Sequence, residues 1–377
     1  MTKSFSISFA RRGYSASGGA EAYLKRLARG LADLGHEASL FTTSDWPRND
    51  WPFGELKHLR ARSPLGFASE LAELRREKSP DVLMSLERIY SCDVYRAGDG
   101  VHRAWINRRT KFETPLQKLR HSFNRKHQDI LRLEKSLLQD RGAGRVIANS
   151  LMVKNEIVEI YNYPPEKIDI VRNGIPLDQF QFDSAARQKS RGDLGLEADE
   201  LAVLFAGSGW ERKGLRFAIE AVQSVRGRKI RLLVAGRGRP GRYPLERTKF
   251  LGEVLDLRPI YAAADIFILP TIYDPFSNAS LEALAAGLPV ITTRANGFSE
   301  IMEDKIHGSI IDQPNDMAAL RKALELWSEA TWRSAARSSI LKRAAQFDIS
   351  KNVARTLEIL LQAVAEAASG SENIGKS

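Results

Sequence analysis

Cysteine is nearly absent from this sequence, since Cys92 is the only one among 377 residues. A single cysteine excludes an internal disulfide framework and fits a reducing compartment, in which a free cysteine is commonly a small buried residue. Long apolar runs are absent too, and none approaches the roughly 20 residues of a membrane-spanning helix. Residues 1–10 are too short and too polar for a secretory signal peptide. We therefore expect a cytoplasmic protein that attaches to a membrane only peripherally, if at all.

Acidic residues are scarce relative to basic ones, with 46 Asp and Glu against 57 Lys and Arg and a net charge of +11. This excess favours an anionic partner, which could be nucleic acid, an acidic membrane surface or a phosphorylated substrate. The sequence has no recognisable nucleic-acid-binding motif. It also has no D-x-D motif and no cluster of His and Cys at metal-ligand spacing. We therefore expect neither a nucleic-acid partner nor a bound metal ion.

Enough apolar material is present for two domains of ordinary size, because 43% of the 377 residues are hydrophobic and 27% are charged. The clearest pattern lies in the second half of the chain. Asp265 to Pro270 is an apolar run closed by proline, which predicts a buried parallel strand, and Val290 to Thr293 predicts another. Between them, Ser277 and Asn278 can cap a helix that ends at Gly287.

Two carboxylates, Asp274 and Glu282, bracket the start of that helix. A helix N-terminus at the carboxyl edge of a sheet attracts anions, and ionised carboxylates accept several hydrogen bonds from sugar hydroxyls. The stretch can therefore form a site for an anion that carries a polyol. An ordinary strand-to-helix turn with solvated acids explains the same spacing.

Two loops in the first half of the chain could also approach a ligand. Phe5 to Phe9 predicts a first strand, and Gly18 and Gly19 precede a helix that starts at Ala20. The full G-x-G-x-x-G spacing of a dinucleotide site is missing, so this pair alone is a weak signal.

The second loop holds Asp99 between Gly98 and Gly100, with His102 three residues later. It follows a strand predicted for Asp81 to Leu86 and is dense in groups that can bind a polyol or a phosphate. A structural turn, in which neighbouring groups satisfy His102, is the alternative.

Residues 108–145 contain eleven Lys or Arg against four Asp or Glu. Their apolar residues recur at helical spacing, which predicts one or two basic amphipathic helices. Such helices can lie on an anionic membrane surface. The alternative is a solvated charged face over an ordinary core contact. The apolar positions are Leu116, Leu119, Phe123, Ile130, Leu133 and Leu137.

A turn at Asn173 and Gly174 predicts the junction between the domains. The second domain restarts with a strand from Leu201 to Gly207, and Arg212 and Lys213 follow in a glycine-flanked loop. Arginine can grip two oxygens of a pyrophosphate and lysine acts as a point charge. A solvated basic turn is the commoner explanation of an isolated pair of this kind.

The stretch from Asp274 to Glu282 resembles the nucleotide-sugar signature of retaining GT-B glycosyltransferases of family four, in which two Glu separated by seven residues flank a P-F-G-like turn. Asp274 stands in the first acidic position and Ser277 replaces the usual Gly. The Gly18-Gly19 loop, the Asn-Gly turn at the domain junction and the Lys213-Gly214 motif match this family in the same order. The Asp99 loop and the basic segment resemble those of bacterial lipopolysaccharide core glucosyltransferases.

This resemblance implies an α/β fold of the GT-B type, with two doubly wound Rossmann-like domains that face each other across a cleft. Residues 1–173 would form the N-terminal, acceptor-side domain, completed by a C-terminal helix over 353–368. Residues 174–352 would form the nucleotide-sugar-binding domain. The composition of residues 369–377 predicts a disordered tail.

The resemblance also assigns roles to individual residues. The expected catalytic residues are Asp99, Arg212, Lys213 and Asp274. The expected donor-binding residues are Gly18, Gly19, Val254, Phe276, Ser277, Asn278 and Glu282. The expected acceptor-binding residues are Glu21, His102 and Arg103.

The implied reaction is metal-independent, retaining transfer of glucose from UDP-glucose to a lipopolysaccharide core or related glycolipid acceptor. The implied location is the inner face of the cytoplasmic membrane, contacted through residues 108–145. Another donor, such as UDP-N-acetylglucosamine or GDP-mannose, is the first alternative. A basic protein that binds nucleic acid or membrane without catalysis is the second, and a scaffold that has lost activity is the third.

Overall fold

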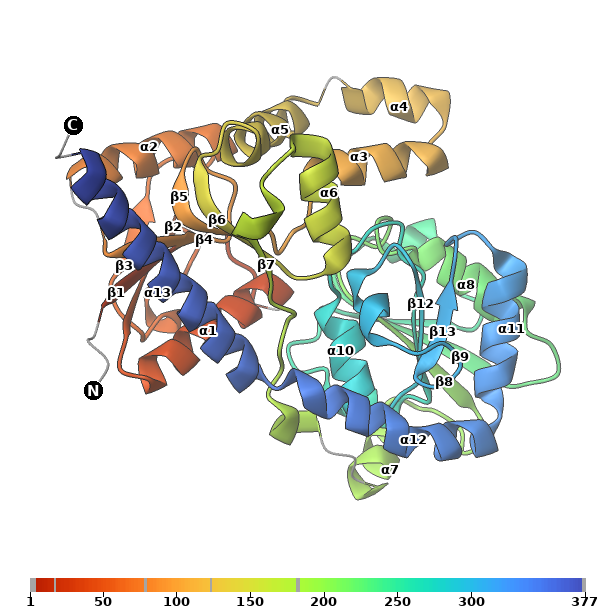
Figure 1. The fold of residues 1–377 in the computed structure, drawn as a ribbon. Coiled ribbons are helices and arrows are strands. Elements are labelled where there is room, and N and C mark those ends of the chain that lie inside the picture. Colours follow the sequence, from red (N-terminus) through yellow and green to blue (C-terminus); the bar gives the residue numbers. More distant parts are fainter. Residues whose placement is uncertain (1–4, 17, 78–79, 123, 181–183, 375–377) are drawn as a thin grey trace. The chain divides into compact units, whose positions relative to one another are not determined.

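In the computed structural model of the chain, the described residues are 5–16, 18–77, 80–122, 124–180 and 184–374. The chain divides into two compact units (Figure 1). Unit 1 comprises Met1–Asn173 and Ile349–Ser377, and unit 2 comprises Gly174–Asp348. Each unit is built around a parallel sheet whose strands are mostly buried.

Unit 1 has a seven-stranded sheet in the order β3-β2-β1-β4-β5-β6-β7, in which every neighbouring pair is parallel. Buried runs such as that of β4 are typical of strands covered by helices on both faces. The strands are β1 Ser6–Ala10, β2 Glu37–Thr43, β3 Leu56–Leu59, β4 Val82–Ser85, β5 Cys92–Arg96, β6 Ala143–Ala148 and β7 Ile168–Ile170. The helices are α1 Gly19–Asp33, α2 Pro64–Glu77, α3 His102–Arg109, α4 Pro115–Ser122, α5 Arg125–Leu138, α6 Leu151–Tyr161 and α13 Ile349–Ile374, with short 3-10 turns η1 Arg48–Asp50, η2 Thr110–Phe112 and η3 Pro165–Lys167.

Unit 2 has a six-stranded parallel sheet in the order β10-β9-β8-β11-β12-β13. The strands are β8 Leu201–Ala206, β9 Ile230–Ala235, β10 Thr248–Gly252, β11 Ile266–Leu269, β12 Val290–Thr293 and β13 Gly308–Ile311. The helices are α7 Ser184–Asp193, α8 Leu215–Ser224, α9 Arg258–Ala263, α10 Asn278–Ala285, α11 Met317–Ser328 and α12 Ala330–Ala344, with 3-10 turns η4 Leu177–Phe180, η5 Pro240–Arg242, η6 Gly297–Ile301 and η7 Ala345–Phe347. The predicted strand–loop–helix–strand unit is confirmed as β11, α10 and β12.

The last helix, α13, returns to the core of unit 1, where it packs beside α1, β4 and β5 (Figure 1). The Tyr23 hydroxyl donates to Asn352 Oδ1 at 2.9 Å. A Cβ atom on Gly30 would lie 2.6 Å from Val353 Cγ2, so the absence of a side chain there allows the two helices to approach. Ile359 is fully buried in the same cluster. Residues from the end of the chain are therefore part of the first unit's core.

The limits of α13 correct two expectations. The helix begins at Ile349 rather than at residue 353, and it continues to Ile374 rather than ending at 368. Residues 369–374 were expected to be disordered but are helical. The Ser369 hydroxyl donates to the carbonyl oxygen of Ala365 at 3.0 Å, so its polar group is satisfied within the helix. Residues 375–377 lie outside the described part of the chain.

Candidate functional site

In each sheet the chain order reverses at one point, and predicted site residues follow strands at or next to that point. In unit 2 this switch point lies between β8 and β11, and in unit 1 it lies between β1 and β4. Open parallel sheets bind ligands outside the carboxyl ends of their strands at such a point. The two edges are therefore candidate sites, and each is described separately.

At the switch point of unit 2, Lys213 and Asp274 form an ion pair. Lys213 Nζ donates to Asp274 Oδ2 at 2.9 Å, and the two side chains are only 13% and 6% exposed. Lys213 follows β8 and Asp274 follows β11, so the pair joins two loops that are 61 residues apart in sequence. The structure thus brings together two of the four predicted catalytic residues.

Two glycines shape the loop that carries Lys213. Gly207 has φ +135, and a Cβ atom there would lie 2.8 Å from Cδ of Lys213, so the lysine stem crosses the end of β8 where a side chain would otherwise lie. Gly214 has φ +76, and its Cβ atom would collide with the carbonyl oxygen of Pro270. Only glycine adopts such backbone angles without strain.

Arg212 contributes its backbone to the same junction. Its carbonyl oxygen accepts from the Ile272 amide and from Thr271 Oγ1, both at 2.9 Å. These bonds tie the loop after β8 to the loop after β11. The half-buried Arg212 side chain makes no hydrogen bond or ion pair with any described residue. None of the described residues therefore uses its guanidinium.

The start of α10 follows the predicted capping pattern, with one correction. Ser277 is the N-cap, and its hydroxyl accepts from the Ser280 amide at 3.2 Å. The amide of Ser277 itself donates to Asn296 Oδ1 at 3.3 Å. Ser277 was predicted to bind the donor, but a neighbouring loop already uses its amide, so that amide does not face an anion in this structure. Asn278 is the first residue of the helix, and Phe276 is buried edge-on against Phe298 with ring centroids 5.8 Å apart.

Glu282 lies one turn further along α10. Its Oε2 accepts from the hydroxyl of Tyr261 at 3.1 Å, and that tyrosine is buried at the end of α9. The carboxylate is half-buried rather than fully solvated. Val254 lies two residues beyond β10 and is also half-buried. Glu282 and Val254 both lie beyond the carboxyl ends of strands of this sheet, as Lys213 does.

At the switch point of unit 1, Arg11 connects two predicted residues. Its Nη1 donates to Asp99 Oδ2 at 3.0 Å and its Nη2 to Glu21 Oε1 at 3.3 Å. Burial alone would lower the pKa of Arg11, but Asp99, Glu87 and Glu21 together raise it, so the guanidinium stays charged. Arg11 was not among the predicted site residues, although its position directly after the first strand was a usable signal.

Gly18 and Gly19 lie where α1 begins. Gly18 is the N-cap, and a Cβ atom on it would collide with the carboxylate of Glu21. The glycine therefore lets Glu21, which is buried, fold back over the start of its own helix toward Arg11. Ser17, which precedes the pair, lies outside the described residues.

The Asp99 loop is held through its backbone. The Ala97 amide donates to the Ile147 carbonyl oxygen at 2.9 Å, and Asn149 Nδ2 donates to the Gly98 carbonyl oxygen at 3.2 Å. Gly100 has φ +70, which explains the glycine after Asp99. The Asp99 side chain, 48% exposed, projects from this fixed loop.

His102 and Arg103 open α3. The ring of His102 meets that of His127 on α5, with Nε2 and Nδ1 3.0 Å apart. Because Arg109 Nη1, which can only donate, lies 3.2 Å from His127 Nε2, the Nδ1 of His127 carries the proton shared with His102. Burial, and next the charge of Arg88, lowers the pKa of His102 to about 3, so the ring is neutral. The ring of His102 thus has a neighbouring partner, His127, as the alternative of a structural turn predicted. The Arg103 side chain is exposed.

The basic segment 108–145 consists mainly of α4 and α5, and the two differ. On α5, Leu133 and Leu137 are fully buried, so the face predicted to lie on a membrane packs inside unit 1. On α4, Leu116 and Leu119 are 77% and 59% exposed. The prediction of membrane contact is therefore wrong for the apolar face of α5. For α4 it stays a prediction. Phe123 lies outside the described residues.

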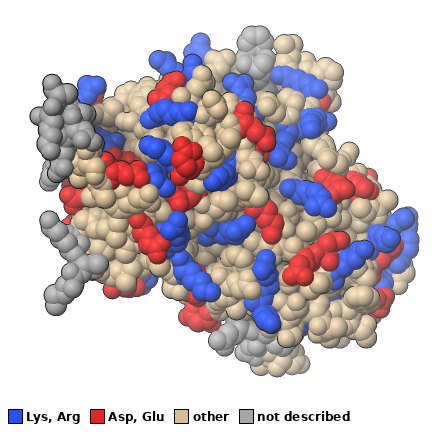
Figure 2. All heavy atoms as spheres, viewed as in Figure 1, with Lys and Arg blue, Asp and Glu red and all other residues tan. Residues whose placement is uncertain are grey.

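Positive charge does not form one continuous surface on the face that Figure 2 shows, where Lys and Arg alternate with Asp and Glu. No helix in the described part of the chain combines the length and apolar character needed to cross a bilayer. Among the described residues, no group of three or more His, Cys, Asp or Glu could hold a metal ion.

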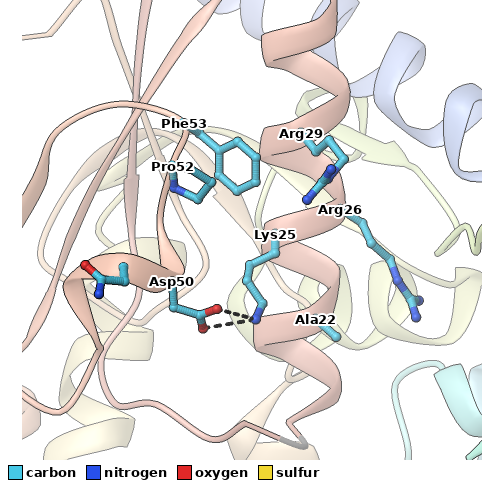
Figure 3. Close-up of a pocket in the computed structure, with 8 residues that line it drawn as sticks. Ala22, Lys25, Arg26, Arg29, Asp50, Pro52 and Phe53 are labelled. Carbon is cyan, nitrogen blue, oxygen red and sulfur yellow. Dashed lines mark hydrogen bonds and ion pairs between the residues drawn. The ribbon is translucent and has the colours of Figure 1, made fainter. Parts of the chain in front are cut away.

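One pocket of unit 1, about 420 Å³ in volume, lies beside the predicted residues rather than among them (Figure 3). It lies against the outer face of α1, where Lys25 Nζ donates to both carboxylate oxygens of Asp50 at 3.0 to 3.1 Å. Arg29 lies 5.8 Å from the ring centroid of Phe53 on the opposite wall. The lining residues are Ala22, Lys25, Arg26, Arg29, Asn49, Asp50, Pro52 and Phe53. The pocket contains none of the predicted residues, and we place the site at the switch points.

Comparisons with known proteins identify the family of the chain. The family described as "Glycosyl transferases group 1" matches residues 200–329, and "Glycosyltransferase Family 4" matches residues 17–179. A "probable transglycosylase" of Burkholderia thailandensis is 32% identical over 372 residues, which cover 95% of this chain and 96% of that protein.

Two solved structures share the fold. The crystal structure of WaaG, a glycosyltransferase involved in lipopolysaccharide biosynthesis, has a TM-score of 0.80 at 21% identity and covers 94% of this chain and 99% of its own. Anabaena HepE in complex with UDP and glucose has a TM-score of 0.72 at 19% identity and covers 95% of this chain and 99% of its own.

Proposed function

Since the chain belongs to the group 1 glycosyltransferases of GT-B type, and is therefore a transferase, we propose that it moves glucose from UDP-glucose to a glycolipid acceptor of the lipopolysaccharide core type. We further propose that the reaction retains the configuration of the sugar and needs no metal ion. The fold shared with WaaG and with HepE makes this acceptor and this donor the first to test.

One observation carries the proposal: a half-buried lysine and a buried aspartate meet at the switch point of unit 2. The residue before that lysine is Arg212, whose guanidinium has no partner among the described residues. A departing diphosphate gains negative charge in the transition state of sugar transfer. Lys213 and Arg212 would stabilise that charge, as a metal ion does in other transferases. Asp274, which orients Lys213, would also accept a hydrogen bond from the donor sugar.

Unit 2 would also hold the nucleoside. Glu282, oriented by Tyr261, would accept hydrogen bonds from the ribose hydroxyls. Val254 would contact the base through its backbone, and Phe276 and Asn278 would line the diphosphate site with Ser277 as the helix cap. These roles follow the family pattern.

Unit 1 would recognise the acceptor. Asp99 projects a half-exposed carboxylate from a fixed loop, which suits a sugar hydroxyl. Arg11 would hold Asp99 and Glu21 in place. Arg103, exposed at the start of α3, would meet an anionic group of the acceptor. The chain offers no side chain placed as a covalent nucleophile in the part described, so we propose transfer on one face of the sugar, with the leaving phosphate assisting removal of the acceptor's proton.

The exposed leucines of α4 suggest how a lipid acceptor would be reached. Leu116 and Leu119 lie one turn apart, and the exposed Lys118 lies between them. Two apolar side chains beside a cation suit the interface of an anionic membrane. We therefore propose that α4 attaches the enzyme peripherally to the inner face of the cytoplasmic membrane.

The test is a thermal-shift panel of nucleotides and nucleotide sugars in EDTA, because a ligand that binds only the native state raises the unfolding temperature. UDP and UDP-glucose should stabilise the chain, and the Lys213→Ala variant should lose most of the shift. Stabilisation by GDP-mannose or UDP-N-acetylglucosamine instead would replace the donor and leave the fold and the roles in unit 2 intact. No shift with any nucleotide would overturn the proposal.

A further inference from the structure

The carboxylate of Glu134, on α5, is almost fully buried and accepts four hydrogen bonds. Oε1 accepts from Arg88 Nε at 2.9 Å and from the His102 amide at 2.6 Å. Oε2 accepts from the Arg103 amide at 3.0 Å and from the Tyr161 hydroxyl at 2.7 Å. A buried carboxylate is costly unless it is paired and fully hydrogen-bonded, and here both conditions are met.

Two of these donors belong to the start of α3, which has no cap of its own. The N-cap position is Val101, whose side chain cannot accept a hydrogen bond. The first amides of a helix need external acceptors and carry a positive partial charge. Glu134 supplies both the acceptor atoms and the negative charge from another helix. Burial would raise the pKa of Glu134, but Arg88, Tyr161 and the two amides lower it, so the group is ionised.

Arg88 holds the other side of the same loop. Its Nη2 donates to the carbonyl oxygen of Gly100 at 2.6 Å while its Nε donates to Glu134. The Arg88–Glu134 pair, with side chains 8% and 1% exposed, therefore holds the residue after Asp99 and the two residues that open α3. Asp99 lies directly before the first of these anchors, Gly100.

We propose that Glu134 is a positioning residue, which fixes the segment from Asp99 to Arg103 so that Asp99 is held ready for the acceptor. The proposal rests on the acceptor role proposed above for Asp99. The role of α5 would then be to position the Asp99 loop and not to contact a membrane. His127 lies seven residues before Glu134, on the same face of α5, and touches the ring of His102. Glu134 and His127, on one face of α5, thus both contact the start of α3, which follows the Asp99 loop.

The test compares Glu134→Gln with Glu156→Gln. Glu156 is a matched control, because it is also largely buried and also pairs with an arginine of α3, Arg108, at 2.9 Å, but Arg108 lies in the last turn of α3 rather than at its start. Hydrogen–deuterium exchange of the full chain should show the amides of His102 and Arg103 exchanging at least about tenfold faster in Glu134→Gln. Glu156→Gln should leave these amides protected.

Enzyme kinetics supply a second readout. With UDP-glucose as donor and a heptose-containing core lipid as acceptor, Glu134→Gln should lower kcat for transfer about 10- to 100-fold. It should leave the KM for UDP-glucose and the thermal shift by UDP unchanged, since those belong to unit 2. Glu134→Asp, which keeps the charge, should recover part of the rate.

Equal exchange and equal transfer rates in the two Gln variants would overturn the proposal. If Glu134→Gln does not fold, Tyr161→Phe removes one donor without changing the charge, and it should loosen the Arg103 amide more than the His102 amide. A Tyr161→Phe variant with no change at either amide would also overturn it. Absence of any thermal shift by nucleotides would instead count against the proposed function, while the exchange result would still stand.

Discussion

The two switch points of this molecule have the same topology and opposite chemistry. In unit 2, a single lysine is held by one buried aspartate, Lys213 by Asp274. In unit 1, a single arginine, Arg11, is shared between buried Glu21 and the half-exposed Asp99. The edge of unit 2 presents Lys213, which the carboxylate of Asp274 orients. The edge of unit 1 presents the carboxylate of Asp99, which Arg11 orients.

Under the proposed function, this difference would let one architecture serve the two halves of a transfer reaction. A diphosphate requires positive charge that is fixed before the leaving group departs, since preorganised charges cost no rearrangement in the transition state. A hydroxyl acceptor requires a hydrogen-bond acceptor held at the right position. The loops after the strands supply each property, and the sheets beneath them are alike.

The largest effect should follow the loss of Lys213. Lys213→Ala removes the point charge for the diphosphate and should lower kcat for transfer about 100- to 1000-fold, as when one oxyanion donor is removed. It also leaves Asp274 buried without its partner, so the unfolding temperature should fall as well. Lys229→Ala is the control, because that lysine of unit 2 lies on the surface. Undiminished turnover would refute the role assigned to Lys213.

The corresponding change in unit 1 sharpens the comparison. Arg11→Met keeps the length of the side chain but frees Asp99 and Glu21, and it should lower transfer about 10- to 100-fold through misplacement of the acceptor. The thermal shift caused by UDP should stay the same, because the residues proposed to hold the nucleoside and the diphosphate lie in unit 2. Loss of that shift would mean that the two edges do not divide donor and acceptor as proposed.

Glycine substitutions test the shape of the unit 2 loop. Gly214 and Gly209 both have positive φ, +76 and +74, but only at Gly214 would a Cβ atom collide with backbone, the carbonyl oxygen of Pro270. Gly209→Ala should cost about 1 kcal/mol of stability for its backbone angle alone, and Gly214→Ala about 3 kcal/mol or more. Denaturant unfolding measures both. Equal losses would show that the contact with Pro270 relaxes at no cost.

The smallest effect concerns pH. Burial lowers the pKa of His102 in unit 1 to about 3 and lowers the pKa of His307 in unit 2. An unfolded histidine takes up its proton near pH 6.5, so the unfolded chain binds more protons below that pH and the free energy of unfolding falls as the pH drops from about 6.5. Each group contributes at most about 1.4 kcal/mol per pH unit.

Unfolding curves between pH 7 and pH 5 would separate the two histidines. His102→Gln should flatten the pH dependence of unit 1, and His307→Gln that of unit 2. A His102→Gln curve as steep as that of the parent chain would show that other groups dominate in unit 1.

Much of the fold could be predicted from the sequence, because buried parallel strands are continuous apolar runs and their ends are marked by glycine, proline or capping residues. β12 was predicted at its observed limits, Val290 to Thr293, and the cap at Ser277 was predicted too. Lys213 and Asp274 were both selected because each follows such a strand. Their ion pair could not be derived, since it depends on which strands are neighbours in the sheet.

The partners that hold the site were harder to predict. Glu134 and Asn296 act on residues that are distant in sequence, and no local spacing marks them. The spacing of apolar residues in α5 correctly predicted an amphipathic helix. That spacing shows which residues share the apolar face, but it does not show whether protein or membrane contacts that face. For Leu133 and Leu137 the cover is unit 1 itself.

The return of α13 to unit 1 has a consequence for synthesis of the chain on the ribosome. Unit 2 is continuous, so it can complete its core as soon as its own residues have emerged, whereas the core of unit 1 needs Val353, Ile359 and Leu360 from the end of the chain. Domains that emerge first usually fold first. Here unit 1 is made first but completes its core last. Until α13 has been made, unit 1 has an apolar groove beside α1 that no helix covers.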